Sequence, residues 1–187
     1  MQQVVSFEPL TPERVRPLRT LNSVLFPVKY NDLVYKQALQ CGDVTQLAYC
    51  EGDLVGAIMC RLEAQPGGTA RLYIISLGVL APYRCLGIGS QLLQRSIAAA
   101  AEDPAITTAA LHVHAGDEEA QGWYLARGFA VQERIANYYR RLSPPDAILM
   151  ARRLCAPQEE PAAAAEEPAA AAAAAGQQEP AVALSGG

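Results

Sequence analysis

Apolar residues recur with two different periods along residues 1–155, and these periods predict the secondary structure. Spacings of three and four positions, typical of one face of a helix, predict four helices, at residues 11–25, 32–39, 88–101 and 117–127. Apolar runs bounded by turn residues predict seven strands, at residues 4–7, 46–50, 54–62, 71–79, 109–115, 129–135 and 147–154. The order β-α-α-β-β-β-α-β-α-β-β predicts an α/β fold of the α+β type, in which helices cover both faces of a mixed sheet.

The first predicted helix carries both a start signal and a disruptive residue. Thr11 can cap a helix, and Pro12 suits its first position. Pro17 lies further along, where proline removes a hydrogen-bond donor. We therefore expect this helix to be kinked or shortened.

The composition changes abruptly at Ala156. Residues 156–187 consist mainly of Ala, Pro, Glu, Gln and Gly and contain no aromatic residue. Such a segment cannot bury enough apolar surface to offset chain entropy, so we predict one domain at residues 1–155 and a disordered tail at 156–187. The tail holds five of the 19 acidic residues, which leaves 14 acidic and 15 basic side chains in the domain. A nearly neutral domain argues against general nucleic-acid binding.

The cysteines and the apolar runs bear on the cellular compartment. The five cysteines are widely spaced, and none forms a C-x-x-C pair or a zinc-type cluster with histidine. The first ten residues lack the pattern of a signal peptide, and no apolar run approaches transmembrane length. These features predict a cytoplasmic protein that can also be nuclear, without metal or membrane contact and monomeric by default.

Arg84-Cys-Leu-Gly87-Ile-Gly89 links a predicted strand directly to a predicted helix. Backbone N–H groups at such a helix start, together with the helix dipole, suit a phosphate or diphosphate. The loop contains no lysine, which argues against a Walker loop, and Leu92 is too bulky for the last position of a dinucleotide fingerprint. The plain alternative is a tight turn that binds nothing.

This loop fits the Arg/Gln-x-x-Gly-x-Gly/Ala pattern and resembles the acetyl-CoA diphosphate loop of the Gcn5-related N-acetyltransferases (GNAT). A closer resemblance, over about residues 7–154, is to the San-type catalytic subunits of the NatE N-terminal acetyltransferases. It rests on the segments LFPVKYN at 25–31, RLYI at 71–74, LGVLAPYR at 77–84, LHV at 111–113 and NYY at 137–139.

The resemblance implies the GNAT acyl-CoA N-acyltransferase fold and an enzyme that uses acetyl-CoA. Its expected reaction is acetylation of the α-amine of nascent chains that begin with Met and an apolar residue, with lysine acetylation as a minor activity. Association with the ribosome-bound NatA complex is also implied. Two alternatives stay open: a transferase for lysines or small amines, and a weakly active CoA-binding adaptor of NatA.

The same resemblance assigns the catalytic base to Tyr73 and His112, which would hold a water molecule and share the role. Strand alternation would put Tyr73, Ile75 and Leu77 on one face of their strand. His114 shares a face with His112 but is not a position that the family uses. By themselves, a strand tyrosine and a strand histidine are more often packing or hydrogen-bonded residues.

Tyr124 has two possible roles. In related enzymes a tyrosine at this position approaches the CoA sulfur and can protonate the thiolate. Trp123 and Tyr124 are equally consistent with an aromatic pair in the core.

The resemblance also implies the residues that bind the two substrates. Main-chain N–H groups near residues 77–79 would orient acetyl-CoA and polarise its thioester carbonyl. The full set expected to bind acetyl-CoA is Leu77, Gly78, Val79, Arg84, Cys85, Leu86, Gly87, Ile88, Gly89, Ser90, Asp117 and Tyr124. The set expected to bind the peptide is Phe26, Pro27, Val28, Tyr30, Ile75, Tyr138, Tyr139 and Leu142. Asp117 replaces a common Asn and Cys85 a usual basic residue, so we expect CoA affinity below the family norm.

Overall fold

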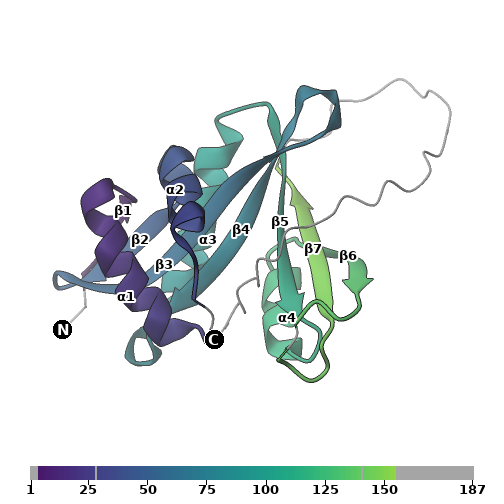
Figure 1. Cartoon of the computed structure of the whole chain (residues 1–187). Helices are drawn as coiled ribbons and strands as arrows, with labels where there is room; N and C mark the ends of the chain where they lie inside the picture. The colour runs from purple at the N-terminus through teal and green to yellow at the C-terminus, as the bar shows by residue number, and fades with distance from the viewer. Residues whose placement is uncertain (1–3, 28, 140, 155–187) are drawn as a thin grey trace, which may run out of the picture.

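The computed structural model describes residues 4–27, 29–139 and 141–154, which form one seven-stranded sheet flanked by helices (Figure 1). The strands are β1 (Val5–Pro9), β2 (Gln46–Cys50), β3 (Asp53–Ala64), β4 (Ala70–Val79), β5 (Ile106–His114), β6 (Ala130–Ile135) and β7 (Ala147–Arg153). The helices are α1 (Val15–Leu25), α2 (Asp32–Gln40), α3 (Ile88–Ala101) and α4 (Glu118–Leu125). The predicted element order is confirmed. The expected peptide contact Val28 and the predicted tail at 156–187 lie outside the described residues.

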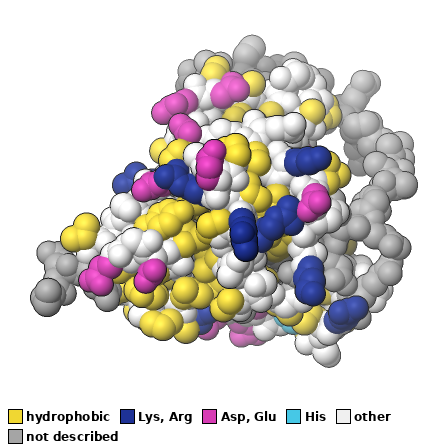
Figure 2. Space-filling view, turned by 60° about the vertical axis from the view of Figure 1, so that its left-hand side comes forward, with side chains coloured by type: hydrophobic (Ala, Val, Ile, Leu, Met, Phe, Trp, Pro, Cys, Tyr) yellow, Lys and Arg dark blue, Asp and Glu magenta, His cyan; other side chains and the backbone are white. Residues whose placement is uncertain are grey.

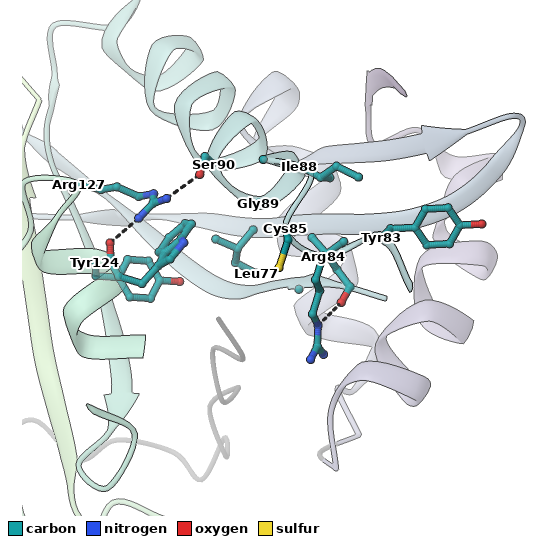
Figure 3. Close-up of a pocket in the computed structure, with 13 residues that line it drawn as sticks. Leu77, Tyr83, Arg84, Cys85, Ile88, Gly89, Ser90, Tyr124 and Arg127 are labelled. Carbon is teal, nitrogen blue, oxygen red and sulfur yellow. Dashed lines mark hydrogen bonds between the residues drawn. The ribbon is translucent and has the colours of Figure 1, made fainter. Parts of the chain in front are cut away.

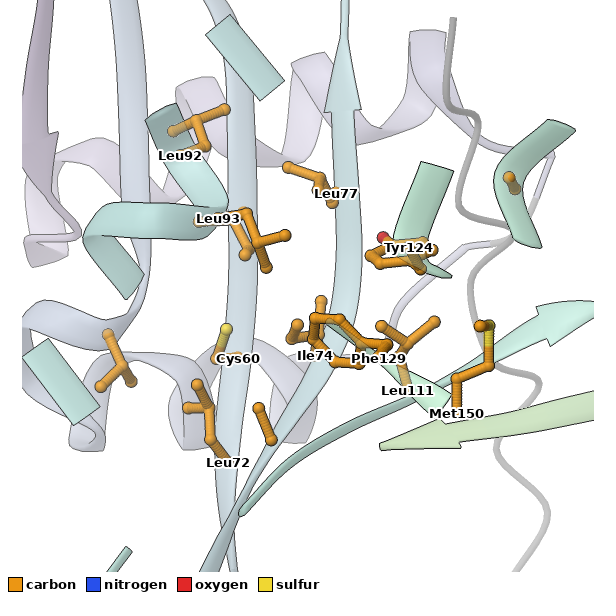
Figure 4. Packing of buried hydrophobic residues seen from close by; sticks show 14 of the residues in the cluster. Cys60, Leu72, Ile74, Leu77, Leu92, Leu93, Leu111, Tyr124, Phe129 and Met150 are labelled. Atoms are coloured by element: carbon orange, nitrogen blue, oxygen red, sulfur yellow. The ribbon is translucent and has the colours of Figure 1, made fainter. Parts of the chain in front are cut away.

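The sheet is mixed, with the order β1-β2-β3-β4-β5-β7-β6. Only β4 and β5 pair in parallel among these strands. Leu92 and Leu93 of α3 and Tyr124 of α4 pack in the cluster on one face (Figure 4). Leu18 of α1 and Val34 of α2 pack in the cluster on the other face. Helices therefore cover both faces, as predicted.

The first helix begins later than predicted. Residues Pro12–Arg14 form a 3-10 turn, the Thr11 side chain makes no capping hydrogen bond, and α1 starts at Val15. Pro17 is thus the third residue of α1, where a helix N–H has no intrahelical acceptor. The missing N–H of Pro17 therefore costs no helix hydrogen bond. The helix is shorter than predicted because it starts at Val15, and Pro17 does not interrupt it.

A β-bulge in β4 changes the expected orientation of its side chains. Met59 pairs with Ser76 while the next residue of β3 pairs with Ile74, so Ile75 is the extra residue. A bulge reverses the alternation of faces. Tyr73 and Ile75 pack on the α1 and α2 side, whereas Leu77 packs in the α3 and α4 cluster. The prediction that Tyr73, Ile75 and Leu77 share a face is therefore wrong for Leu77.

The parallel strands β4 and β5 are paired only over their first halves. Their ladder ends where Tyr73 pairs with Ala110, and the ribbons separate beyond that point (Figure 1). The second half of β4 still pairs with β3 but has no β5 partner. The sheet consequently opens between two neighbouring strands.

The surface of one face carries side chains of both charge signs among apolar ones (Figure 2). No helix in the described part of the chain is long and apolar enough to cross a bilayer. The same residues contain no group of three or more histidine, cysteine or acidic side chains placed to hold a metal ion.

Candidate active site

A pocket of about 300 Å³ lies where β4 ends and α3 begins, and α4 closes its other side (Figure 3). Ten residues of the predicted acetyl-CoA set line it: Leu77, Gly78, Val79, Arg84, Cys85, Gly87, Ile88, Gly89, Ser90 and Tyr124. Leu86 is exposed and does not line the pocket. Asp117 does not line it either; its carboxylate accepts a hydrogen bond from the Ala120 N–H at 2.9 Å and caps α4.

The loop before α3 is shaped by residues with positive φ. Cys85 has a φ of 62° and Gly87, the N-cap of α3, a φ of 73°, a conformation that favours glycine. Arg84 secures the loop, because its Nε donates to the Val79 carbonyl at 3.0 Å. The loop therefore brings the first turn of α3, with its unpaired N–H groups and positive dipole end, to the pocket.

Gly89 is the second residue of α3 and lines the pocket. A Cβ added to Gly89 would lie 3.7 Å from the Trp123 ring and 3.9 Å from the Val79 side chain, both of which line the pocket. The glycine therefore leaves the main chain at the start of α3 open to the pocket. The residues present thus fit the diphosphate of acetyl-CoA, which needs close approach to the main chain.

Tyr124 is at once a core residue and a residue of the pocket. Its side chain is buried, and its ring lies edge-on to Trp123, with centroids 4.9 Å apart, and to Phe129 at 5.4 Å. Burial raises the pKa of Tyr124, so the hydroxyl keeps its proton at neutral pH. Both of its sequence-based interpretations are compatible with this position.

Tyr73 and His112 meet where β4 and β5 separate. The Tyr73 hydroxyl lies 2.7 Å from Nδ1 of His112 in a direct hydrogen bond. Tyr138 stacks on the His112 ring, with centroids 4.4 Å apart and planes inclined by 22°. Arg61 lies over the Tyr73 ring, its Cζ 4.4 Å from the centroid. The predicted pair is therefore brought together, and Tyr138 of the predicted peptide set contacts it.

Burial decides the protonation states of this pair. It lowers the pKa of His112 to about 4, helped by the positive charges of Arg71 and Arg61 and opposed by Glu63. It also raises the pKa of Tyr73 well above its ordinary value. At neutral pH the tyrosine therefore keeps its proton and the imidazole is uncharged. His112 is therefore free to accept a proton at neutral pH.

Three buried hydroxyls lie near one another beside this pair. The hydroxyls of Tyr30, Ser76 and Tyr139 make no well-formed hydrogen bond among the described residues. Burial raises the pKa of Tyr30, and the nearby Ser76 hydroxyl partly offsets this rise by a hydrogen-bond interaction. Buried polar groups nearly always have a partner, so the cluster suits water or the polar groups of a ligand. Ser76 is absent from the predicted set; its only sequence signal is a polar residue within an apolar strand.

The rest of the predicted peptide set is less uniform. Phe26 and Ile75 are buried in the cluster that α1 and α2 cover. Pro27 is exposed and Leu142 is partly exposed. Phe26 lies edge-on to Tyr30, with ring centroids 6.4 Å apart. An apolar wall and a set of hydroxyls therefore lie together.

Replacing Tyr30 with phenylalanine is expected to act in opposite directions on stability and on peptide binding. The free protein loses a buried hydroxyl that makes no well-formed hydrogen bond, and burying such a group is costly, so its melting temperature should not fall. A hydrogen bond to the peptide is lost, so KM for the peptide should rise about 3- to 10-fold. Thermal unfolding and steady-state kinetics measure both.

Tyr35→Phe is the matched control. The Tyr35 hydroxyl accepts a hydrogen bond from Asn22 Nδ2 at 3.2 Å, so this variant should lose stability and keep its KM. Lost stability with an unchanged KM in Tyr30→Phe, together with a raised KM in Tyr35→Phe, would contradict a ligand-binding role for the hydroxyl cluster.

The fold and this site define an acyltransferase that uses a CoA thioester. The model of the acetyltransferase (GNAT) family matches residues 14–129, and the chain belongs to this family. The zebrafish (Danio rerio) N-alpha-acetyltransferase 50 is 40% identical over 145 residues, which cover 78% of this chain and 86% of the relative. The probable N-acetyltransferase san of Drosophila melanogaster is 37% identical over 145 residues, 78% of each chain.

A solved structure gives the same picture. Arabidopsis thaliana Naa50, in complex with the bisubstrate analogue CoA-Ac-MVNAL, superposes with a TM-score of 0.74 at 40% sequence identity. The similarity covers 79% of this chain and 97% of that one. The expected GNAT fold is thereby confirmed.

Proposed function

We propose that this enzyme transfers an acetyl group from acetyl-CoA to the α-amine of protein chains that begin with Met and an apolar residue. The observation that carries the proposal is the Tyr73–His112 pair. Tyr73 lies on β4, whose end lines the pocket suited to the CoA diphosphate, and near Tyr139 of the hydroxyl cluster. The similar Arabidopsis protein is in complex with an analogue that joins CoA to a peptide beginning Met-Val, which supports this reading.

The chemistry needs a base and a polarised carbonyl. An α-amine has a pKa of about 7.7–8.0, so a substantial fraction of it is uncharged near neutral pH and can attack the thioester. The nitrogen becomes strongly acidic as its bond to the acetyl carbon forms, and the uncharged His112 accepts the proton that it loses, directly or through a water molecule. The hydrogen bond to Tyr73 holds the His112 ring in position. When bound, acetyl-CoA supplies the acetyl group as an activated thioester. The edge of β4 beyond Tyr73 has no β5 partner, so main-chain N–H groups between Leu77 and Val79 can stabilise negative charge on the thioester oxygen.

The first two residues of the peptide test this proposal. An apolar binding site for the second residue of the peptide discriminates strongly against a charged side chain, because burying an unpaired charge is costly. We expect kcat/KM for a Met-Leu peptide to exceed that for the matched Met-Asp peptide by at least about 10-fold, a factor that corresponds to about 1.4 kcal/mol. Equal values for the two peptides would contradict the proposed selectivity.

The pH dependence should come from the substrate. His112 is uncharged above a pKa of about 4 and is protonated only below it. We therefore expect kcat/KM for a Met-Leu peptide to fall below pH 8 with one apparent pKa, that of the peptide amine at about 7.7–8.0. Initial rates from pH 5 to 9 measure this profile. A second break between pH 5 and 7 would contradict an uncharged, buried His112.

Wider roles are part of the proposal and rest on the resemblance. We propose association with the ribosome-bound NatA complex, in the cytoplasm and also in the nucleus. Lysine acetylation is proposed only as a minor activity, because a lysine amine, with a pKa of about 10.4, is harder to deprotonate. Co-purification with tagged NatA subunits tests the association. A protein that binds NatA and CoA without any turnover would instead be an adaptor.

A further inference from the structure

The pocket contains a cation that the sequence patterns do not indicate. Arg127 follows the end of α4, and its side chain lines the pocket opposite the first turn of α3 (Figure 3). Its Nη2 donates to the Ser90 hydroxyl at 2.7 Å and its Nη1 to the Trp123 carbonyl at 2.8 Å. The guanidinium also lies over the Trp123 ring, 3.6 Å from the ring centroid. Three contacts thus hold its position before any ligand binds.

This guanidinium retains donors for a ligand. An arginine carries five N–H donors and stays protonated in proteins. The hydrogen bonds to Ser90 and Trp123 use two of them within the described residues. The planar arrangement of the donors matches the oxygens of a phosphate. A positive charge held in place therefore lies beside the helix end where anions are already favoured.

The loop itself offers little other positive charge. Between residues 84 and 90 the only basic side chain is Arg84, and its Nε is bonded to the Val79 carbonyl. Position 85 is a cysteine. Arg127 approaches the same helix end from α4. It therefore adds a second positive charge for an anion to the amides and Arg84 that the loop provides.

We propose that Arg127 is a coenzyme-binding residue that contacts the diphosphate of acetyl-CoA. This inference rests on the use of acetyl-CoA in the proposed function. It also bears on the expectation of weak CoA binding drawn from Cys85, because the cation missing from the loop is supplied by the end of α4.

Calorimetric titration of Arg127→Met tests the proposal, since methionine keeps an apolar stem of similar length. A hydrogen bond to a charged group contributes about 1.5–3 kcal/mol, so the Kd for CoA should rise about 10- to 100-fold. The Kd for dephospho-CoA, which retains the diphosphate, should rise by the same factor. Arg127→Lys should recover part of the loss, because it keeps the charge.

The matched control is Arg95→Met on α3. Arg95 also lies over an aromatic ring, that of Phe7 at 4.5 Å, but it does not line the pocket, so its variant should bind CoA like the wild type. Equal Kd values for wild type and Arg127→Met would overturn the proposal. A loss seen with CoA but not with dephospho-CoA would move the contact to the 3′-phosphate and overturn the diphosphate assignment.

Two further outcomes separate structural effects from phosphate contact. Acetyl-pantetheine has no phosphate, so any inhibition by it should be equal for wild type and Arg127→Met. If Arg127→Met weakened the binding of acetyl-pantetheine and of CoA by the same factor, the substitution would have distorted the pocket. That result would overturn the proposal. A wild-type protein that fails to bind CoA would refute the proposed function itself.

Discussion

His112→Ala is expected to lower kcat for a Met-Leu peptide by about 10²- to 10⁴-fold, the usual contribution of a general base. The imidazole is the only member of the Tyr73–His112 pair that can accept a proton at neutral pH. Tyr73→Phe removes only the hydroxyl that lies 2.7 Å from Nδ1 and should lower kcat by a smaller but clear factor. Initial rates at saturating acetyl-CoA measure both effects.

Two controls make this result specific to the pair. Tyr49→Phe removes a tyrosine hydroxyl from β2, a strand of the same sheet that does not border the pair, and should leave kcat unchanged. The Kd for CoA should also stay the same in the two active-site variants, because neither residue lines the pocket. Unchanged turnover in both His112→Ala and Tyr73→Phe would refute the role of the pair as the base.

Gly89→Glu is expected to abolish acetyl-CoA binding while leaving the fold intact. The added side chain would leave its Cβ between Trp123 and Val79 and place a carboxylate where the phosphates should bind. We expect the Kd to rise at least about 100-fold, which corresponds to about 2.8 kcal/mol. Stability should be retained or improved, because glycine disfavours helix and an acidic residue suits the first turn.

Gly122→Glu provides the matched control. It makes the same substitution within α4, where an added Cβ meets nothing within 4 Å and the residue does not line the pocket. Calorimetry should give wild-type affinity for this variant, and thermal unfolding should show both variants folded. Wild-type affinity in Gly89→Glu would contradict the location of the coenzyme site.

Local signals in the sequence predict most of the fold. The predicted bounds of β2 and α3 agree with the structure, because a strand bounded by turn residues and a helix opened by glycines are strong local patterns. β3 is longer than predicted and runs from Asp53 to Ala64. Its extra residues lie outside the apolar run, and Glu63 forms ion pairs with Arg61 of the same strand and Arg71 of β4. A contact between strands, such as that of Glu63 with Arg71, leaves no mark on the periodicity.

The features that were not predicted depend on tertiary structure. The bulge at Ile75 follows from the pairing of β4 with β3, and it moves Leu77 to the opposite face. Arg127 reaches the pocket only because α4 packs near the start of α3. Ser76 joins the hydroxyl cluster through the same bulged segment. The loop motif located the coenzyme pocket, but not the residues that other elements contribute to it.

The most direct test of the central claim uses one peptide that begins Met-Leu and also contains an internal lysine. The protein is incubated with this peptide and acetyl-CoA, and fragmentation mass spectrometry locates the acetyl group. We predict that acetylation is found on the α-amine and that His112→Ala nearly abolishes it. Acetyl groups found mainly on the lysine, or no acetylation by a wild-type protein that binds CoA, would contradict the assignment of this chain as an N-terminal acetyltransferase.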